Sequence, residues 1–262
     1  MQNRSLGRGF AAFASSMVVV SPALTACVAE PSYEDWAATD GAAGRINLDD
    51  VQDAFKRAES VTDFEDRVNR IYEGDGIILI RVDQDGDRMQ LEAFEDLDKN
   101  GEISESSDDK LFSIVEDHDQ HEMRGYGTNG YYGSHFGTGN FLFTYLMFSS
   151  IAGSPYYYHT SPARYSRIRQ DRASYRKSPS YGNQLKRNHS YNNHQKKFNG
   201  SQYSNASRNV SQGRQSYQSV QKSSGQFKSL NKSASRFGSR GSARGGGGSN
   251  RVIGFERRTG IT

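Results

Sequence analysis

Side-chain oxygens recur at regular intervals between residues 96 and 102. Asp96, Asp98, Asn100 and Glu102 alternate with other residues around Gly101, and a turn at that glycine would direct several of the oxygens toward one point. Calcium takes roughly six to eight oxygen ligands from carboxylates, amides and carbonyls. The pattern therefore indicates a calcium site as the first candidate for chemistry in this chain.

The segment from Asp96 to Ser104 resembles the start of an EF-hand loop. It has oxygen ligands at positions 1, 3 and 5, the turn glycine at position 6 and an apolar residue at position 8. The resemblance implies a bidentate Glu at position 12, where this chain has Ser107, followed by Asp108 and Asp109. The flanking segments also have the pattern of strands, whereas an EF-hand has helices. The likeness therefore covers the loop alone.

Asp83, Asp85 and Asp87 form a second acidic cluster around a glycine. Asp, Asn and Gly also suit hairpin turns without any metal, because they tolerate positive φ and bond to their own backbone. Both acidic loops are therefore open to two interpretations, and the metal-free turn is favoured. A third group, His118, Asp119 and His121, is interpreted as exposed histidines in a polar turn.

Cys27 is the only cysteine, so neither an intramolecular disulfide nor a cysteine cluster for zinc is expected. Two positive charges, Arg4 and Arg8, come before a mostly small and apolar run over residues 10–20. This order of charge and apolar residues is typical of a targeting segment, which is excluded from fold reasoning.

The sequence Leu24-Thr25-Ala26-Cys27 resembles the lipobox of bacterial lipoprotein precursors. The resemblance implies cleavage before Cys27 and diacylglycerol on its sulfur, and two or three acyl chains give stable membrane anchoring. Because Val28 follows the cysteine, the likeness to enterobacterial lipoproteins implies sorting to the outer membrane in a Gram-negative host. The alternative is an ordinary cleaved signal or a short membrane segment.

Charge is strongly segregated along the chain. Residues 28–158 contain 10 Lys and Arg against 28 Asp and Glu, whereas residues 159–262 contain 21 Lys and Arg and only two acids. Mean hydropathy is −0.82, and the hydrophobic share of 34% is below the usual value of about 45–50%. One small folded region followed by a long disordered one is therefore expected.

The acidic region carries the local signals of an α+β domain. Asn47 can cap a helix with Leu48, Val51 and Phe55 on one face, and Thr62 to Glu65 has a capping-box pattern before a second helix, with Gly74 as its stop. Apolar or alternating runs broken by Asp- and Gly-rich turns then predict an antiparallel meander. Its expected strands are residues 77–82, 88–94, 110–115 and 121–126.

The apolar run within residues 140–153 is about a dozen residues long, too short for the roughly 20 that span a bilayer as a helix. We expect it to pack on the sheet or, alternatively, to lie in a membrane interface. The expected organisation is a signal peptide (1–26), a tether (27–45), an acidic α+β domain (46–126), a Gly- and aromatic-rich apolar segment (127–158) and a disordered basic tail (159–262).

The tail is rich in Ser, Asn, Gln, Gly, Arg and Lys with isolated aromatics, and its composition predicts disorder. Its charge suits anionic lipids, lipopolysaccharide, cell-wall polymers or the acidic head itself, with a solvated spacer as the alternative. Residues 240–246 are similar to RGG segments, but export disfavours nucleic acid as a partner. The layout also resembles that of YgiB-type bacterial lipoproteins.

Enzyme motifs for nucleophilic, phosphate or metalloprotease chemistry are not found. The sequence therefore favours a non-enzymatic, membrane-anchored envelope lipoprotein with an acidic folded head and a polyanion-binding basic tail. A calcium-binding module and an RGG-type nucleic-acid-binding protein are the alternatives.

Overall fold

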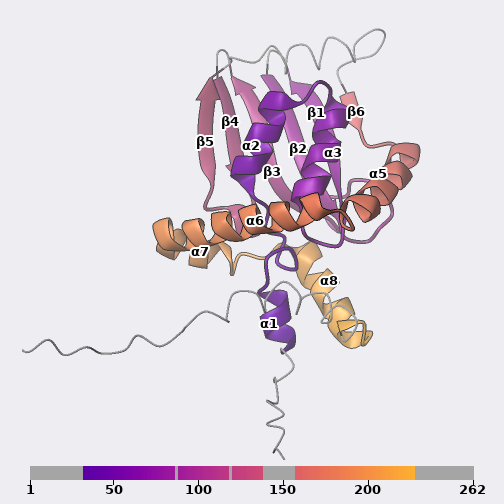
Figure 1. The fold of residues 1–262 in the computed structure, drawn as a ribbon, viewed down its shortest axis with the longest axis vertical. Coiled ribbons are helices and arrows are strands. Elements are labelled where there is room, and N and C mark those ends of the chain that lie inside the picture. The colour runs from indigo at the N-terminus through magenta and orange to yellow at the C-terminus, as the bar shows by residue number, and fades with distance from the viewer. Residues whose placement is uncertain (1–31, 86–87, 118–119, 138–156, 228–262) are drawn as a thin grey trace, which may run out of the picture. The chain divides into compact units, whose positions relative to one another are not determined.

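The computed structural model describes residues 32–85, 88–117, 120–137 and 157–227. These residues form an α+β fold around a six-stranded antiparallel sheet with the strand order β5-β4-β3-β2-β1-β6 (Figure 1). The strands are β1 (Ile77–Asp85), β2 (Arg88–Asp96), β3 (Asp109–Asp117), β4 (Gln120–Gly125), β5 (Gly133–Gly137) and β6 (Tyr157–His159).

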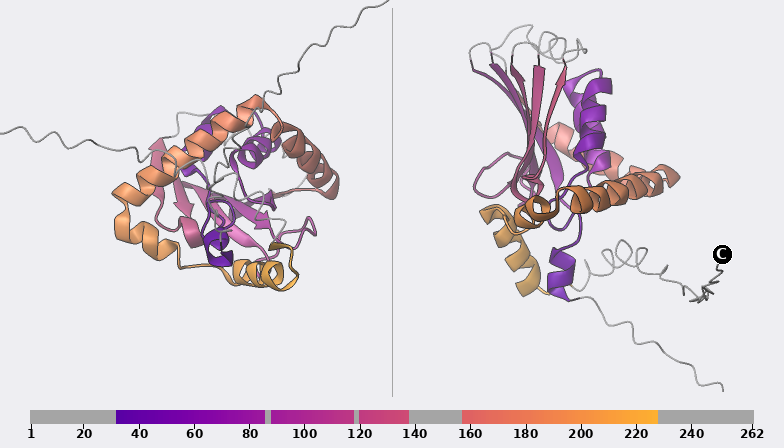
Figure 2. Two further views of the ribbon diagram at one scale, coloured as in Figure 1. Left: turned by 60° about the horizontal axis from the view of Figure 1, so that its bottom comes forward. Right: turned by 90° about the vertical axis from the view of Figure 1, so that its left-hand side faces the viewer.

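Helices precede and follow the meander in the chain. They are α1 (Tyr33–Ala37), α2 (Leu48–Arg57), α3 (Val61–Ile71), the 3-10 turn η1 (Gly127–Asn129), α5 (Pro162–Tyr175), α6 (Pro179–Phe198), α7 (Gly200–Ala206) and α8 (Gln212–Ser223). Figure 2 shows the sheet along its edge, with α2 and α3 lying against one face.

The two helices predicted before the sheet are present, and their first turns explain where they begin. The Asn47 side chain accepts a hydrogen bond from the Asp50 amide and caps α2, as predicted. The second cap differs from the prediction, because Ser60, and not Thr62, accepts from the Asp63 amide and starts α3. Glu65, the expected partner in that capping box, is buried.

The four predicted strands of the meander are confirmed, and each is longer than expected or shifted by a residue or two. Side chains alternate between the two faces. Ile78, Ile80 and Val82 enter the core beneath α2 and α3, whereas Arg81 pairs on the other face with Glu92 across the strand register. The alternation therefore separates an apolar face from a charged one.

Aromatic rings fill the space between the helices and the sheet. Phe55 of α2 and Phe64 of α3 meet edge to face with ring centroids 5.5 Å apart, and Phe64 meets Phe112 of β3 in the same way at 6.4 Å. His121 stacks on Phe136 with a centroid distance of 5.2 Å and is buried. Its predicted exposure was therefore wrong, because its inward position on β4 places the ring in this cluster.

The predicted tail is not disordered over residues 159–227, because α5 to α8 and the end of β6 occupy it. Ser-Pro pairs start two of its helices, with Ser161 and Ser178 as N-caps and proline at the first helical position. In α6 a stripe at helical spacing is buried although it consists of Tyr, Asn and Gln: Tyr181, Gln184, Asn188, Tyr191, Asn192 and Gln195. A search for apolar periodicity could not find it.

The predicted boundaries also change at both ends of the acidic domain. Ser32 and Asp35 form a capping box at α1, and Trp36 is buried against Tyr33 and Phe227, so this part of the tether is folded. Beyond Tyr126 the sheet continues into β5 and β6. Residues 138–156, which include the predicted apolar run, and residues 228–262 of the tail lie outside the described residues.

Candidate functional site

The acidic loop that follows β2 is organised by its first residue. Asp96 is fully buried; its Oδ1 accepts a hydrogen bond from the Lys99 amide at 2.7 Å and its Oδ2 accepts one from the Gly101 amide at 3.1 Å. Lys99 and Gly101 have φ values of 64° and 77°, in the left-handed region that glycine adopts most easily. The carboxylate thus holds a tight turn together, which both interpretations of the loop require.

The next two candidate ligands bond along the same loop. Asp98 Oδ1 accepts from the Asn100 amide at 3.1 Å, and Asn100 Oδ1 accepts from the Glu102 amide at 2.7 Å. Glu102 is exposed. Both residues were predicted as ligands. The Asn100 oxygen instead bonds to the loop backbone, and the Glu102 carboxylate faces solvent.

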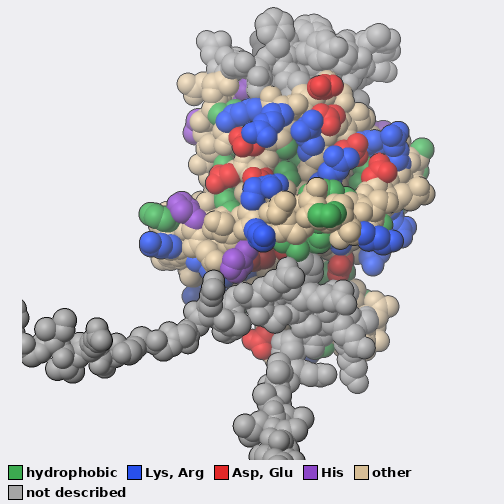
Figure 3. All heavy atoms as spheres, in the orientation of Figure 1, with side chains coloured by type: hydrophobic (Ala, Val, Ile, Leu, Met, Phe, Trp, Pro, Cys, Tyr) green, Lys and Arg blue, Asp and Glu red, His purple; other side chains and the backbone are tan. Residues whose placement is uncertain are grey.

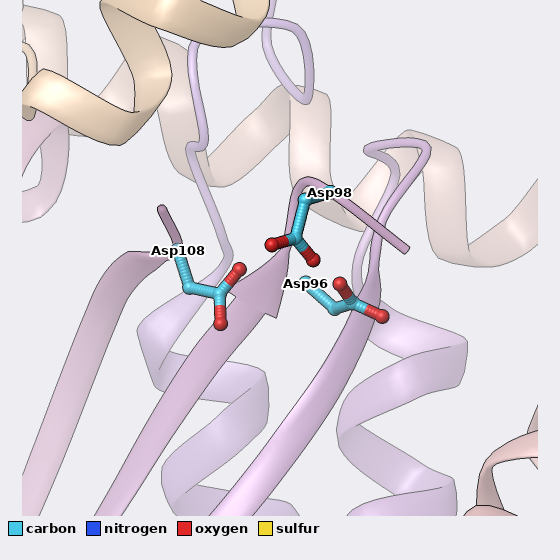
Figure 4. Close-up of side chains that lie close together, drawn as sticks. All are labelled: Asp96, Asp98 and Asp108. Atoms are coloured by element: carbon cyan, nitrogen blue, oxygen red, sulfur yellow. The ribbon is translucent and has the colours of Figure 1, made fainter. Parts of the chain in front are cut away.

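Asp108 joins the loop from the start of β3. Its Oδ1 accepts from the Leu97 amide at 3.2 Å and its Oδ2 from the Ser104 amide at 2.8 Å. Carboxylate oxygens of Asp96, Asp98 and Asp108 all lie within 4.8 Å of one another, and Figure 4 shows Asp98 between the other two. Asp108 lies one residue beyond the EF-hand position 12, and the sequence prediction had not included it among the ligands.

Burial and mutual repulsion shape the electrostatics of this Asp96–Asp98–Asp108 cluster. Burial raises the pKa of Asp108 to about 6, with the negative charges of Asp96 and Asp98 adding to the effect. Burial also raises the pKa of Asp96. A bound cation would relieve this repulsion, and the three carboxylates fit part of a calcium shell whose remaining ligands would be carbonyls or water.

Of the second predicted cluster, only the side chain of Asp83 belongs to the described part of the chain. Asp83 lies on β1, where its Oδ2 is 3.2 Å from Arg81 Nε. Asp85 pairs with Arg88 across the β1–β2 register, and Asp87 lies outside the described residues, as do His118 and Asp119. Within the described part of the chain, Asp83 is thus matched to an arginine and not to other carboxylates.

The helices of the basic segment dock on the acidic domain through arginines. Arg164 of α5 lies 2.9 Å from Glu65 and 2.6 Å from Asp66, and Arg187 of α6 lies 2.9 Å from Asp50. Burial is the main cause that raises the pKa of Glu65 despite its arginine partner. The opposite charges of the two chain segments therefore meet within the fold, at the helix–domain boundary.

The deepest of these contacts belongs to Arg214 of α8, which is 1% exposed. Its guanidinium pairs with Glu95 of β2 and, at 3.0 Å, with Asp109 of β3. Tyr72 donates its hydroxyl hydrogen to the same Glu95 carboxylate. A Cβ added at Gly44 would lie 2.7 Å from the guanidinium, so glycine is needed there for this arginine to enter.

A different set of basic side chains, on these helices and on the turns that join them, faces solvent. Arg169, Lys177, Lys186, Lys196, Lys197 and Arg208 are exposed, and no ion pair joins any of them to a carboxylate among the described residues. Figure 3 shows Lys and Arg side chains over α5 and α6 and also over α2 and α3, with Asp and Glu among them. We call these six residues the outer basic surface. The sequence showed the charge but not that folded helices and the turns between them present it.

The lipidation candidate Cys27, like the whole predicted signal peptide, lies outside the described residues. Within the described part of the chain, no helix combines the length and apolar character needed to cross a membrane. No protein-family model matches the chain, and comparisons with curated proteins and with solved structures give no significant match.

Proposed function

We propose that the protein is a non-enzymatic component of the cell envelope, anchored by lipid on Cys27, whose outer basic surface binds a polyanionic partner. The observation that carries the proposal is that the basic residues fall into two groups, one paired with carboxylates and one exposed to solvent. Arg164, Arg187 and Arg214 neutralise carboxylates of the acidic domain, while the outer basic surface stays available on docked helices.

Rigid presentation favours binding over a spacer role. The face of α6 opposite its buried stripe carries Lys186 and Lys197, and residues 172–227 contain no Asp or Glu. A surface of one charge sign attracts anionic polymers or headgroups over about the Debye length of 8–10 Å at physiological ionic strength. The partner chemistry is therefore phosphate or carboxylate in a dense array, as in lipid headgroups, lipopolysaccharide or cell-wall polymers.

The anchor is tested by metabolic palmitate labelling of the wild type and of Cys27→Ser in a bacterial host. We expect label and a membrane fraction for the wild type, with unprocessed, unlabelled precursor for the variant. Equal mobility and no label in both would refute the anchor. A matched Ser32→Ala variant, which keeps Cys27, controls for effects of mutation near the N-terminus.

The polyanion part is tested separately by binding to anionic vesicles, lipopolysaccharide and purified cell-wall polymer at rising salt. A charge-driven contact should weaken as salt rises. Neutralising Lys186 and Lys197 together should weaken binding. The control neutralises Arg57 of α2 and Arg67 of α3, each of which pairs with an Asp four residues earlier in its own helix. This control should have a smaller effect. Binding that ignores both salt and these variants would contradict the proposal.

A second function, calcium binding, is favoured by one observation, the approach of Asp96, Asp98 and Asp108 to within 4.8 Å. The site would be weak, because each of these carboxylates already accepts hydrogen bonds from backbone amides of the loop. Calorimetry with calcium on the full chain tests it. We expect heat that Asp108→Asn removes and Asp83→Asn leaves unchanged; no heat at millimolar calcium would exclude the function.

A further inference from the structure

The end of α6 exposes an aromatic ring on a helix that is otherwise held firmly. Phe198 is 65% exposed, and Val220 at 58% is the other large hydrophobic residue exposed to this degree in the described structure. The buried stripe of α6 ends at Gln195, one turn before Phe198. At this i+3 spacing Phe198 lies on nearly the same side of the helix as the stripe, beyond its last buried residue.

Positive and aromatic groups surround the ring. His194 stacks on Phe198 with ring centroids 4.1 Å apart, and Lys197 Nζ lies 5.5 Å from the Phe198 centroid. Lys196 is exposed, and its Nζ lies 5.9 Å from the centroid of Tyr203 in α7. One lysine therefore borders the ring itself and a second lies toward α7. Residues 172–227 contain no Asp or Glu, and Asp49 of α2 lies within electrostatic range of His194.

The chain turns sharply just after Phe198. Asn199 is both the last cap of α6 and the first cap of α7, and a Cβ added at Gly200 would meet no atom within 4 Å. The residues from His194 to Gly200, which we call the α6–α7 corner, thus lie at a turn with open space beside it. An open corner suits a broad surface better than a ligand that needs an enclosing pocket.

The chemistry of the corner matches the interface of a bilayer. An aromatic ring is stable at headgroup depth with its apolar body below the phosphates, and lysines beside it gain about 1 kcal/mol each near an anionic leaflet. The apolar stem of a lysine can also lie against lipid while its ammonium group stays in water. A base of single-stranded nucleic acid would stack on the same ring, but the proposed export places lipid nearer.

We infer that the α6–α7 corner is a membrane-contact site, at which Phe198 enters the headgroup region of an anionic phospholipid bilayer and Lys196 and Lys197 neutralise its phosphates. The inference rests on the proposed function for its setting, because lipid on Cys27 would hold the domain next to a bilayer. It goes further in naming the side chains and the surface.

The experiment uses the full chain with Cys27→Ser as the parent, so that no acyl chain contributes. Binding is measured to phosphatidylcholine vesicles and to vesicles that also contain phosphatidylglycerol. Phe198→Ser should lower partitioning to the anionic vesicles about tenfold, and Lys196→Gln with Lys197→Gln should lower it about 25-fold. Val220→Ser, the matched exposed position on α8, should change it less than twofold.

A second variant reports depth without removing the aromatic group. Phe198→Trp should bind like the parent and should be quenched by brominated lipid, whereas Val220→Trp should not be quenched. The native Trp36 is 4% exposed and provides the same background in both proteins. Absence of quenching at position 198 would overturn the inference even if the Phe198→Trp protein still binds the vesicles.

The remaining outcomes separate this inference from the proposed function. If Phe198→Ser binds anionic vesicles like the parent, the corner is not the contact site, although polyanion binding survives. If Phe198→Ser loses single-stranded DNA binding but keeps vesicle binding, the corner recognises nucleic acid and the inference fails. A parent that ignores vesicles but binds lipopolysaccharide also overturns it. The anchor itself stands or falls only on palmitate labelling of the wild type.

Discussion

Arg214 and Glu95, each 1% exposed, form an ion pair that joins helix α8 of the basic segment to strand β2 of the acidic domain. Two charges are removed from water here, and the cost is offset only because each has further partners. Asp109 also lies against the guanidinium, and the Gly76 amide donates to the Glu95 carboxylate at 2.9 Å. Removing one partner of such a pair is strongly destabilising, because the other charge stays buried without compensation.

The first prediction concerns that pair. Arg214→Met should lower the free energy of unfolding by roughly 3–5 kcal/mol, because Glu95 and Asp109 then stay buried without their cation. Urea denaturation of the full chain measures the change. Arg208→Met, at an exposed position near the end of α7, is the matched control and should stay within about 0.5 kcal/mol of the wild type; equal effects at the two positions would argue against the buried pair.

The second prediction follows from Glu73, whose pKa burial raises to about 7 from its usual 4.5. A carboxyl group with a raised pKa in the folded state favours folding below its usual pKa, and this contribution is lost as pH rises toward 7. Glu73→Gln cannot ionise and still accepts a hydrogen bond from Asn188. It should therefore raise stability at pH 8 by up to about 3 kcal/mol and change little at pH 4.

Thermal unfolding across pH 4 to 8 measures this difference. The exposed Glu102→Gln is the control, for which we expect a flat difference from the wild type. A Glu73→Gln protein that gains stability equally at both ends of the range would show that ionisation of Glu73 is not the cause.

The third prediction concerns the Asp96–Asp98–Asp108 cluster. Because the pKa of Asp108 is about 6, protons compete with calcium below that pH. Calcium affinity should therefore rise between pH 5 and pH 7.5, with release of protons on binding. Calorimetry in two buffers of different ionisation enthalpy checks both effects. An affinity that is the same at the two pH values would mean that Asp108 is not a ligand.

The fourth prediction tests the folding of the basic segment. Trypsin should spare Arg172 and Arg214, because both are buried, although residues 159–262 are rich in cleavage sites. Asn188→Ala should expose this segment, since the Asn188 amide donates at 2.8 Å to the carbonyl of Ile71 and at 2.8 Å to Glu73. The variant should lose about 2–3 kcal/mol of the free energy of unfolding, because two buried hydrogen bonds are removed.

Limited proteolysis followed by mass spectrometry reads out the sites in order of cleavage. Asn193→Ala, on the exposed face of the same helix, should be cleaved like the wild type. Early cleavage at Arg214 in the wild type would contradict the docking of α8.

The local patterns of the acidic region were sufficient to predict its elements. Asn47 caps α2 because its short polar side chain can bond to an amide three residues on, and strands β1 to β4 follow alternation of apolar and polar residues. Both signals are contained within a few neighbouring residues. They predicted the α+β class, two helices and the meander, with errors of up to three residues at the ends of the strands.

The cation-site prediction was partly local and partly not. Asp96 and Asp98 were identified from their spacing, and the structure brings them together. Asp108 joins them because β3 returns beside β2, and Asn100 turns its oxygen to the Glu102 amide instead. Spacing within a loop shows which side chains carry oxygen, but the return of the next strand decides which oxygens converge.

The sequence by itself determined the segregation of charge and the elements of the acidic domain. Only the tertiary structure decided that α5 to α8 fold, because their buried faces carry Tyr, Asn, Gln and Arg, which are stable inside only when distant partners satisfy them. Arg214 finds Glu95 119 positions away in the chain. A pattern among neighbouring residues cannot identify a partner so far away in the chain. The burial of polar side chains therefore could not be predicted without the tertiary structure.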